Sequence, residues 1–362
     1  MGLGKKIGFF SAFILPFLLL LGSYLGGYGY YLPLIFSFVF LPIIDFMAGE
    51  DSTNVPEDKI AFISKEKYYE IILYLWVFIQ TGILIWCFYH IANKHLEAFE
   101  WIGFILGASY ITGGIGITVA HELGHKHSKL QRFISKLLLM QVFYMHFIIE
   151  HNQGHHVHVA TPKDPATAKK GENFYAFWIR SVFNGYFHAW KIENKRLAKS
   201  GISRLSVQNK MIWYNLAPIL FAVLSTLIFS LFSGRVVFEI PLFFFSQSLL
   251  AFTLLEHVNY IEHYGIIRKE TEPGKFERVT PQHSWNANHR ISNFFLFQLQ
   301  RHSDHHINAT RPYQVLKQYN ESPQLPAGYP TMVILSLFPP LWFRIMNKRL
   351  EEHTQLTEIR ST

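Results

Sequence analysis

The sequence is poor in charged residues and in cysteine. Only 16% of its 362 residues are charged and 50% are hydrophobic, whereas soluble domains carry about a quarter charged residues. The single cysteine, Cys87, lies inside an apolar run, which excludes a disulfide framework and a Cys-x-x-Cys metal site. No Gly-x-Gly-x-x-Gly motif follows a predicted strand, so a Rossmann-type nucleotide site is excluded as well. Together these absences indicate a membrane protein.

Long apolar stretches dominate what is present. A helix needs about 20 apolar residues to cross a bilayer, and six such stretches lie within residues 7–120 and 211–260, beginning near Ile7, Tyr28, Tyr68, Phe99, Met211 and Val236. A seventh, weaker stretch (Thr331 to Met346) contains Pro339 and Pro340, which interrupt a helix, so we expect it to be peripheral or re-entrant. We therefore predict an all-α integral membrane protein with six transmembrane helices, forming one domain over residues 1–362.

The distribution of basic residues predicts how the chain is oriented in the membrane. The net charge is +8, and lysine and arginine are concentrated at the N-terminus and in the polar segments 121–210 and 261–330. The short loops on the other side carry only Lys94 and Arg235. Because basic loops remain in the cytoplasm, we expect both termini and both polar segments to be cytoplasmic, and the charge requires no nucleic-acid partner. Within the first segment we expect an aromatic-rich helix from about Phe174 to Lys199.

Histidines are clustered in these polar segments and at the ends of the neighbouring spans. The first cluster, HELGH, lies at the end of the fourth span, and helical residues four apart share a face. The second, EHNQGHH, repeats that spacing and adds a neighbouring histidine turned by about 100°. The third is NYIEHYG, and the fourth is LQRHSDHH, whose histidines would lie on one helical stripe. The candidate ligands are His121, His125, His151, His155, His156, His263, His302, His305 and His306.

This number of histidines indicates more than one metal ion. HExxH alone is also the motif of zinc proteases, but such a site uses three or four ligands, whereas nine imidazoles suit two metals. Imidazole binds iron, copper, zinc and nickel, and a redox-compatible, all-histidine site beneath an apolar helix bundle favours iron. A ligand histidine normally donates its second N–H to a carboxylate or carbonyl. The nearby carboxylates Glu122, Glu150, Glu262 and Asp304 are candidates for that role or ordinary helix-surface charges.

The four clusters resemble the histidine boxes of a known family. HELGHK, EHNQGHH followed by VATPKDPAT, NYIEHYG, and QHSWNANH leading into LQRHSDHH are similar, in order and spacing, to the boxes of membrane alkane 1-monooxygenases. The wider membrane di-iron superfamily, including fatty-acid desaturases, shares only a looser pattern. The resemblance implies two non-haem iron ions held by the nine histidines. It also implies that His283 lies outside the ligand set as a supporting residue, whereas His257 departs from the family pattern and is not expected to bind metal.

The resemblance implies terminal hydroxylation of an alkane to a primary alcohol, with dioxygen and two electrons. An unactivated methyl C–H bond is beyond acid–base chemistry, so the metal must carry the hard step. The protein would present an alkane from the bilayer in a dry apolar channel. One cysteine excludes a fused rubredoxin, so a separate rubredoxin and an NAD(P)H-dependent rubredoxin reductase are implied. The implied location is the bacterial inner (plasma) membrane.

A basic surface could dock an acidic electron carrier, although the positive-inside bias explains the same residues. The residues concerned are Lys163, Lys169, Lys170, Lys195, Arg196 and Lys199. Three other functions remain open at this point. A fatty-acyl desaturase or other lipid hydroxylase would act on acyl substrates. A membrane zinc protease would bind one zinc per chain, and a non-enzymatic metal-binding or transport protein would place ionisable residues at the bilayer midplane.

Overall fold

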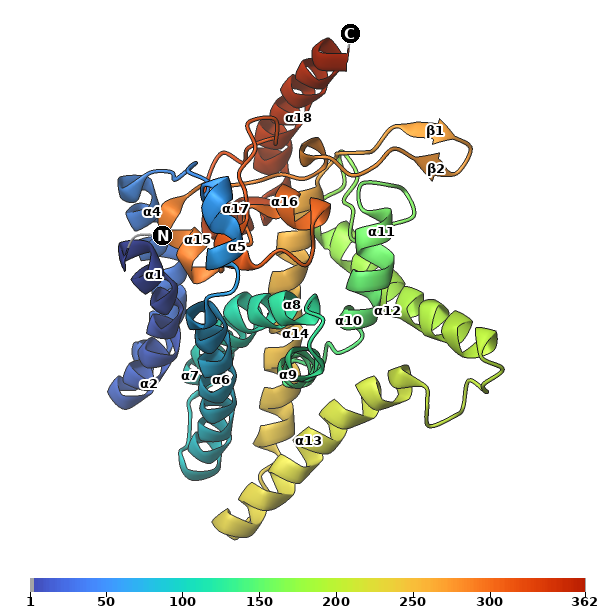
Figure 1. The fold of residues 1–362 in the computed structure, drawn as a ribbon. Coiled ribbons are helices and arrows are strands. Elements are labelled where there is room, and N and C mark those ends of the chain that lie inside the picture. The colour runs from blue at the N-terminus through green and yellow to red at the C-terminus, as the bar shows by residue number, and fades with distance from the viewer. Residues whose placement is uncertain (1–2, 362) are drawn as a thin grey trace.

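The computed structural model describes residues 3–361 and consists almost entirely of helices (Figure 1). Within these residues, six helical segments are long and apolar enough to cross a membrane, namely Gly4–Leu25, Gly27–Ala48, Lys67–Asn93, Ala98–Gly124, Lys210–Ser233 and Glu239–His263. These are the six stretches predicted from the sequence. The expectation of an all-α, multi-pass membrane protein is therefore confirmed, and it agrees with the demand of a bilayer that every backbone polar group be paired within its own segment.

Spans 1 and 2 form a tight hairpin built from short consecutive helices. Span 1 comprises α1 (Leu3–Gly8), η1 (Phe9–Phe13) and α2 (Ile14–Leu25), and span 2 comprises η2 (Gly27–Tyr31), α3 (Leu32–Ile35), η3 (Phe36–Phe40) and α4 (Leu41–Ala48). Gly26 turns the chain with a φ of 68°, a conformation that favours glycine. A Cβ on Gly22 would lie 2.1 Å from the carbonyl oxygen of Gly29, so the two spans meet at their backbones.

Spans 4 and 6 form the centre of the bundle. Span 3 is α6 (Lys67–Asn93), span 4 comprises α7 (Ala98–Tyr110), η4 (Ile111–Ile117) and α8 (Thr118–Gly124), span 5 is α13 (Lys210–Ser233), and span 6 is α14 (Glu239–His263). The π-helix η4 packs directly on α14, and the backbones are so close that a Cβ on Gly113 would lie 2.5 Å from the carbonyl oxygen of Ala251. Span 4 is mostly buried, whereas α13 lies at the periphery with most of its surface exposed.

The remaining elements gather at one end of the bundle, as Figure 1 shows. Before span 5 these are α5 (Glu57–Ile63), α9 (Lys129–Met140), α10 (Phe147–Glu150), η5 (His151–His155), α11 (His156–His158) and α12 (Phe174–Lys199). After span 6 they are β1 (Glu270–Glu272), β2 (Lys275–Phe276), η6 (Pro281–His283), α15 (Arg290–Phe295), α16 (His302–Ile307), η7 (Tyr313–Val315), α17 (Tyr329–Ser336) and α18 (Pro339–Ser361). The two strands form an antiparallel hairpin in which Glu270 pairs with Phe276.

Two predictions about this polar end are confirmed. Helix α12 has the bounds expected from the sequence. The apolar stretch near the C-terminus is divided into α17 and α18, with Pro339 opening the second helix, and it is not one of the six membrane-spanning candidates among residues 3–361.

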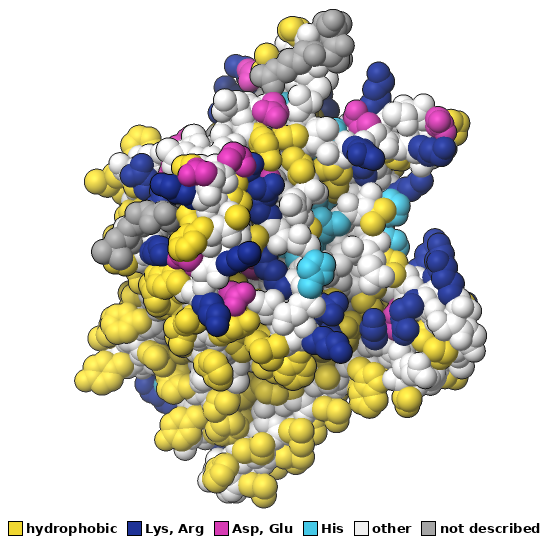
Figure 2. Space-filling view, in the orientation of Figure 1, with side chains coloured by type: hydrophobic (Ala, Val, Ile, Leu, Met, Phe, Trp, Pro, Cys, Tyr) yellow, Lys and Arg dark blue, Asp and Glu magenta, His cyan; other side chains and the backbone are white. Residues whose placement is uncertain are grey.

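The surface divides at the same level as the fold. In Figure 2 the half that contains the spans is covered by hydrophobic side chains, and charged and histidine side chains lie above it. Helix α9 is seen end-on in Figure 1 while α6 and α14 run along the page, so α9 lies across the spans at the level where the two kinds of surface meet.

Candidate metal centre

The nine histidines predicted from the sequence converge at the ends of spans 4 and 6 that face the polar half of the molecule. They form two groups, within each of which the ligand nitrogens all lie within 4.8 Å of one another. One group has five members and the other has four. The five-histidine group is His121, His125, His151, His156 and His305, and the four-histidine group is His155, His263, His302 and His306.

A π-helical turn divides the second histidine cluster between the two groups. In an α-helix His151 and His156 would be roughly 140° apart, because each residue turns the chain by about 100°. Residues His151–His155 instead form the π-helix η5, in which hydrogen bonds link residues five apart and bring such residues onto one side. The Nε2 atoms of His151 and His156 therefore lie 3.0 Å apart. His155 is directed to the other group, where its Nε2 lies 3.3 Å from that of His306.

The spacing of the ring nitrogens fits a metal ion in each group. Two imidazole nitrogens about 2.1 Å from one metal and at right angles to each other lie about 3 Å apart. In the five-histidine group the Nε2 of His151 is 3.1 Å from that of His125, and the Nε2 of His305 is 3.1 Å from that of His156. In the four-histidine group the corresponding distances are 3.1 Å for His302 and His263 and 2.8 Å for His306 and His302.

Burial keeps most of these imidazoles neutral, which is the state that donates a lone pair to a metal. Outside the membrane-spanning segments, burial first, and then the neighbouring imidazoles, lower the pKa of every histidine in the two groups except His155 well below its ordinary value. These are His125, His151, His156, His302, His305 and His306. Two groups of uncharged, converging nitrogen donors are therefore available, and the chemistry of the donor set fits two ions that accept imidazole, iron included.

His155 has a carboxylate partner that the sequence did not reveal. Its Nδ1 lies 2.9 Å from Oδ2 of Asp164, which is 2% exposed and also accepts the hydroxyl hydrogen of Thr167 at 2.6 Å. Burial lowers the pKa of His155, but the charge and hydrogen bond of Asp164 outweigh it and raise that pKa. For Asp164, burial raises the pKa, and His155 and Thr167 together lower it to about 2. The carboxylate thus fixes the Nδ1–H tautomer and leaves Nε2 free for a metal.

Glu262 is the one predicted carboxylate that reaches a histidine group. Its Oε2 lies 3.1 Å from Nε2 of His302, and its Oε1 accepts the hydroxyl hydrogen of Tyr329 at 2.6 Å. Because Nε2 is the nitrogen that His302 turns toward its group, the Glu262 carboxylate lies beside the four-histidine group rather than behind one of its ligands. The role of Tyr329 was not indicated by the sequence, since it lies outside every histidine cluster.

The other predicted supporting residues contact neighbouring segments instead. Glu122 accepts the backbone N–H of Tyr313 and pairs with Lys126. Glu150 lies 3.2 Å from Nδ1 of His188. The remaining two are directed to loops: Asp304 accepts from Lys317 N–H and Tyr319 OH and pairs with Arg311, and His283 contacts Thr280 and Glu277.

His257 lies apart from both groups, in agreement with its exclusion from the predicted ligands. Its ring stacks on Phe174 at 3.5 Å between centroids, and its Nδ1 donates to the Thr253 carbonyl. It therefore packs α14 against α12.

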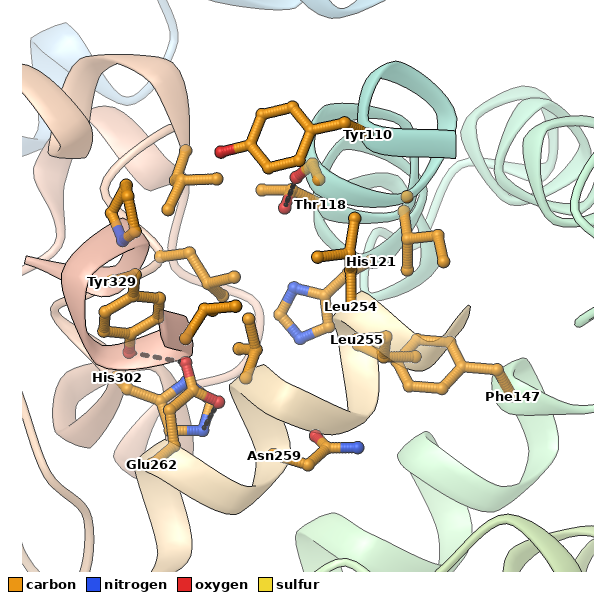
Figure 3. A pocket seen from close by; sticks show the side chains of 18 of the residues that line it. Tyr110, Thr118, His121, Phe147, Leu254, Leu255, Asn259, Glu262, His302 and Tyr329 are labelled. Carbon is orange, nitrogen blue, oxygen red and sulfur yellow. Dashed lines mark hydrogen bonds and ion pairs between the residues drawn. The ribbon is translucent and has the colours of Figure 1, made fainter. Parts of the chain in front are cut away.

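A largely apolar cavity leads to the histidines (Figure 3). It lies between spans 2, 4 and 6 and α17, with Phe38 and Tyr110 at one end. Members of both histidine groups also line it, His121 and His151 from one and His302 from the other. Glu262 and Tyr329 lie together on its wall in Figure 3, joined by their hydrogen bond.

Comparison with known proteins agrees with this geometry. Residues 98–336 match the family described as fatty acid desaturase. Among curated proteins, the chain is 39% identical to alkane 1-monooxygenase 2 of Alcanivorax borkumensis, over 96% of this chain and 92% of that protein. It is 40% identical to alkane 1-monooxygenase 2 of Pseudomonas aeruginosa, over 90% and 87% of the two chains. It is also 40% identical to alkane 1-monooxygenase of Pseudomonas putida, over 84% and 73%.

The matched residues 98–336 include both histidine groups, and the first of these relatives matches 96% of the chain. The matches, the six-span fold and the order of the histidine boxes agree, and the chain belongs to the alkane 1-monooxygenase family of histidine-rich membrane enzymes.

Proposed function

We propose that this protein hydroxylates the terminal carbon of alkanes to give primary alcohols. The observation that carries the proposal is the apolar cavity whose lining includes His121, His151 and His302, so that one molecule bound in it would contact both histidine groups. The overall reaction consumes the alkane, one dioxygen, two electrons and two protons, and yields the alcohol and one water. Two bound iron ions would supply the activation of dioxygen that this reaction needs.

The residues that line the cavity explain why the proposed substrate is a hydrocarbon without polar groups. Most of the side chains that line it are hydrocarbon or aromatic, including Leu254, Leu255 and Val258 on α14. Such walls bind a hydrocarbon without unpaired polar groups and exclude water from the site. A chain held between spans 2, 4 and 6 has one end at the histidines, and this orientation favours reaction at a terminal carbon over an internal one.

We infer that the electrons come from a separate rubredoxin, reduced by an NAD(P)H-dependent reductase. His156 is one of the two members of the histidine groups that are only partly buried, and it is followed by the exposed Val157. The same polar end carries Lys163 and Lys169, which favour an acidic carrier. Two of the other basic residues named above are already engaged in ion pairs, Lys170 with Glu351 and Arg196 with Glu193.

We also propose how the protein is oriented and in which membrane it lies. The polar end that holds the histidines carries most of the lysine and arginine (Figure 2), and the positive-inside rule places such an end in the cytoplasm. In a bacterium this is the inner membrane, where a soluble rubredoxin and its reductase have access to the histidine end.

Reconstitution tests the function directly. The purified protein is analysed for metal and then supplied with rubredoxin, rubredoxin reductase, NADH and octane or hexadecane. We expect about two iron ions per chain and the 1-alcohol as product, identified by gas chromatography. Zinc in place of iron, or desaturation of an acyl substrate without alcohol from any alkane, would contradict the proposal and favour the zinc protease or the fatty-acyl desaturase.

A further inference from the structure

A basic groove opens beside the metal centre, between α9 and the start of α13. It has a volume of about 500 Å³. Five lysine and arginine side chains line it, together with His125, His127 and the side-chain amides of Asn152 and Gln153, and no carboxylate is part of its lining. The five basic residues are Lys126, Lys129, Arg132, Lys136 and Lys210.

Most of this positive charge is uncompensated. Within the described residues only Lys126 has a recorded ion pair, with Glu122 at 2.6 Å, and the side chains of the other four have none. Glu193 lies near the Lys210 backbone but is held in two hydrogen bonds by Arg196. Partial burial, and then repulsion from Lys210 and Arg132, lower the pKa of Lys136. Several cations gathered in a groove without an anion form a site that a ligand with negative charge would neutralise.

The groove lies at the edge of the membrane. Helix α9 crosses the bundle at the level where hydrophobic surface gives way to charged surface, and lysine and arginine side chains gather there in Figure 2. Its apolar residues Leu130 and Phe133 are each more than half exposed. Below the groove runs the exposed apolar face of α13, which begins with Trp213 and Leu216, and tryptophan is typical of the headgroup level of a membrane.

We propose that this groove binds the headgroup of a phospholipid with net negative charge. The phosphate would be held by Arg132, Lys136 and Lys210, and the amides of Asn152 and Gln153 would donate to its remaining oxygens. The acyl chains would lie along the apolar face of α13. A basic pocket between membrane helices is a known type of anionic-lipid site, and here it is aligned with an apolar surface that a soluble ligand would leave uncovered.

The lipid would connect two segments that carry metal-binding histidines. One part of the lining comes from the segment between Gly124 and Lys136 and includes His125. Another part comes from Ile148, Ile149, Asn152 and Gln153, which flank His151 in the sequence. An anion between these two parts offsets the repulsion among the cations and holds the two segments together. The proposed site therefore supports the five-histidine group from outside, without contact with substrate.

Native mass spectrometry in a neutral detergent tests the proposal without any need for turnover. The purified full-length protein is titrated with dioleoyl phosphatidylglycerol or with dioleoyl phosphatidylcholine. We expect one phosphatidylglycerol retained per chain, in clear preference to phosphatidylcholine. At about 1 kcal/mol per lysine or arginine, the double variant Arg132→Gln/Lys136→Gln should bind phosphatidylglycerol roughly 30-fold more weakly. The matched double variant Lys269→Gln/Arg278→Gln, which removes two exposed cations elsewhere, should bind it as the original protein does.

Because Lys136 is partly buried, its replacement could weaken lipid binding by disturbing the fold, and a second variant separates the two effects. Lys129→Gln/Arg132→Gln changes only exposed side chains and should also weaken phosphatidylglycerol binding. Equal retention of the two lipids, or unchanged phosphatidylglycerol binding in both groove variants, would overturn the proposal. Displacement of the lipid by millimolar inorganic phosphate would overturn it in favour of a free anion. Loss of rubredoxin binding with unchanged lipid binding in these variants would assign the groove to the protein partner instead.

Discussion

At the scale of single residues, charged neighbours of the ligands serve two different purposes. Asp164 holds a ligand, His155, although it lies nine residues away in a loop. Asp304 and Arg301 lie inside the last histidine cluster but hold loops instead. Arg301 donates to the carbonyls of Leu316, Asp51 and Thr53. Proximity in sequence to a histidine therefore does not identify its partner, because the partner is chosen by how distant loops fold back.

This difference can be tested at Asp164. The change Asp164→Asn keeps the shape of the side chain but removes the charge that fixes the tautomer of His155. Loss of such an outer partner typically weakens metal binding by about 10- to 100-fold, and we expect that decrease in competition titrations against a chelator. The control Asp304→Asn disturbs a loop that holds no ligand tautomer. Equal metal affinity in the two variants would contradict the assigned role of Asp164.

A second residue-level prediction concerns the last histidine cluster. His305→Ala removes one of five donors from its group, and we expect about one metal ion fewer per chain, together with loss of alcohol formation. Metal analysis of the purified protein gives the first result without an activity assay. His283→Ala removes a histidine of similar burial that lies with Thr280 and Glu277, so it should keep the full metal content. Full metal content in His305→Ala would remove this residue from the ligands.

At the scale of elements, the sequence predicted the helices better than the turns within them. Apolar length alone located six spans, and α12 was predicted with its observed bounds. The π-helices η4 and η5 were not predicted, because hydropathy and residue type carry no signal for one extra residue in a turn. As a result, the sequence grouped His151 with His155, whereas the π-turn assigns His151 and His156 to one group and His155 to the other.

The contact between spans 4 and 6 gives a prediction for these elements. Because a Cβ on Gly113 would lie 2.5 Å from the Ala251 backbone, Gly113→Val must separate the two spans whose polar ends carry His121 and His263. Overpacking of this kind costs about 1–3 kcal/mol, and we expect a lower unfolding temperature and reduced metal content. Gly82→Val makes the same change in span 3, where a Cβ meets nothing within 4 Å, and should leave both measurements near those of the original protein. Equal effects of the two changes would show that the close contact is unimportant.

At the scale of the whole molecule, the candidate metal centre is formed where four segments distant in the sequence meet. The candidate ligands come from the end of span 4, from η5 and α11, from the end of span 6 and from α16. The sequence indicated all nine candidates because each is a histidine in a dense cluster. It could not indicate how they divide into two groups, since this depends on the π-turn of η5 and on the packing of α16 against the other three segments.

Removal of the metal should therefore loosen the polar end and leave the bundle in place. Ligands that bind only the folded state stabilise it by about 4 kcal/mol at a thousandfold excess over Kd, and here that stabilisation is concentrated where the ligand segments meet. We expect that chelation increases backbone hydrogen exchange in residues 151–158 and 302–307. Helix α6, and α14 as far as about residue 255, should remain protected, since these helices pack through side chains that are not candidate metal ligands. Re-addition of iron should restore protection. If exchange in these two segments is the same with and without metal, the histidines are held by the surrounding fold alone, and the metal contributes nothing to the stability of the polar end.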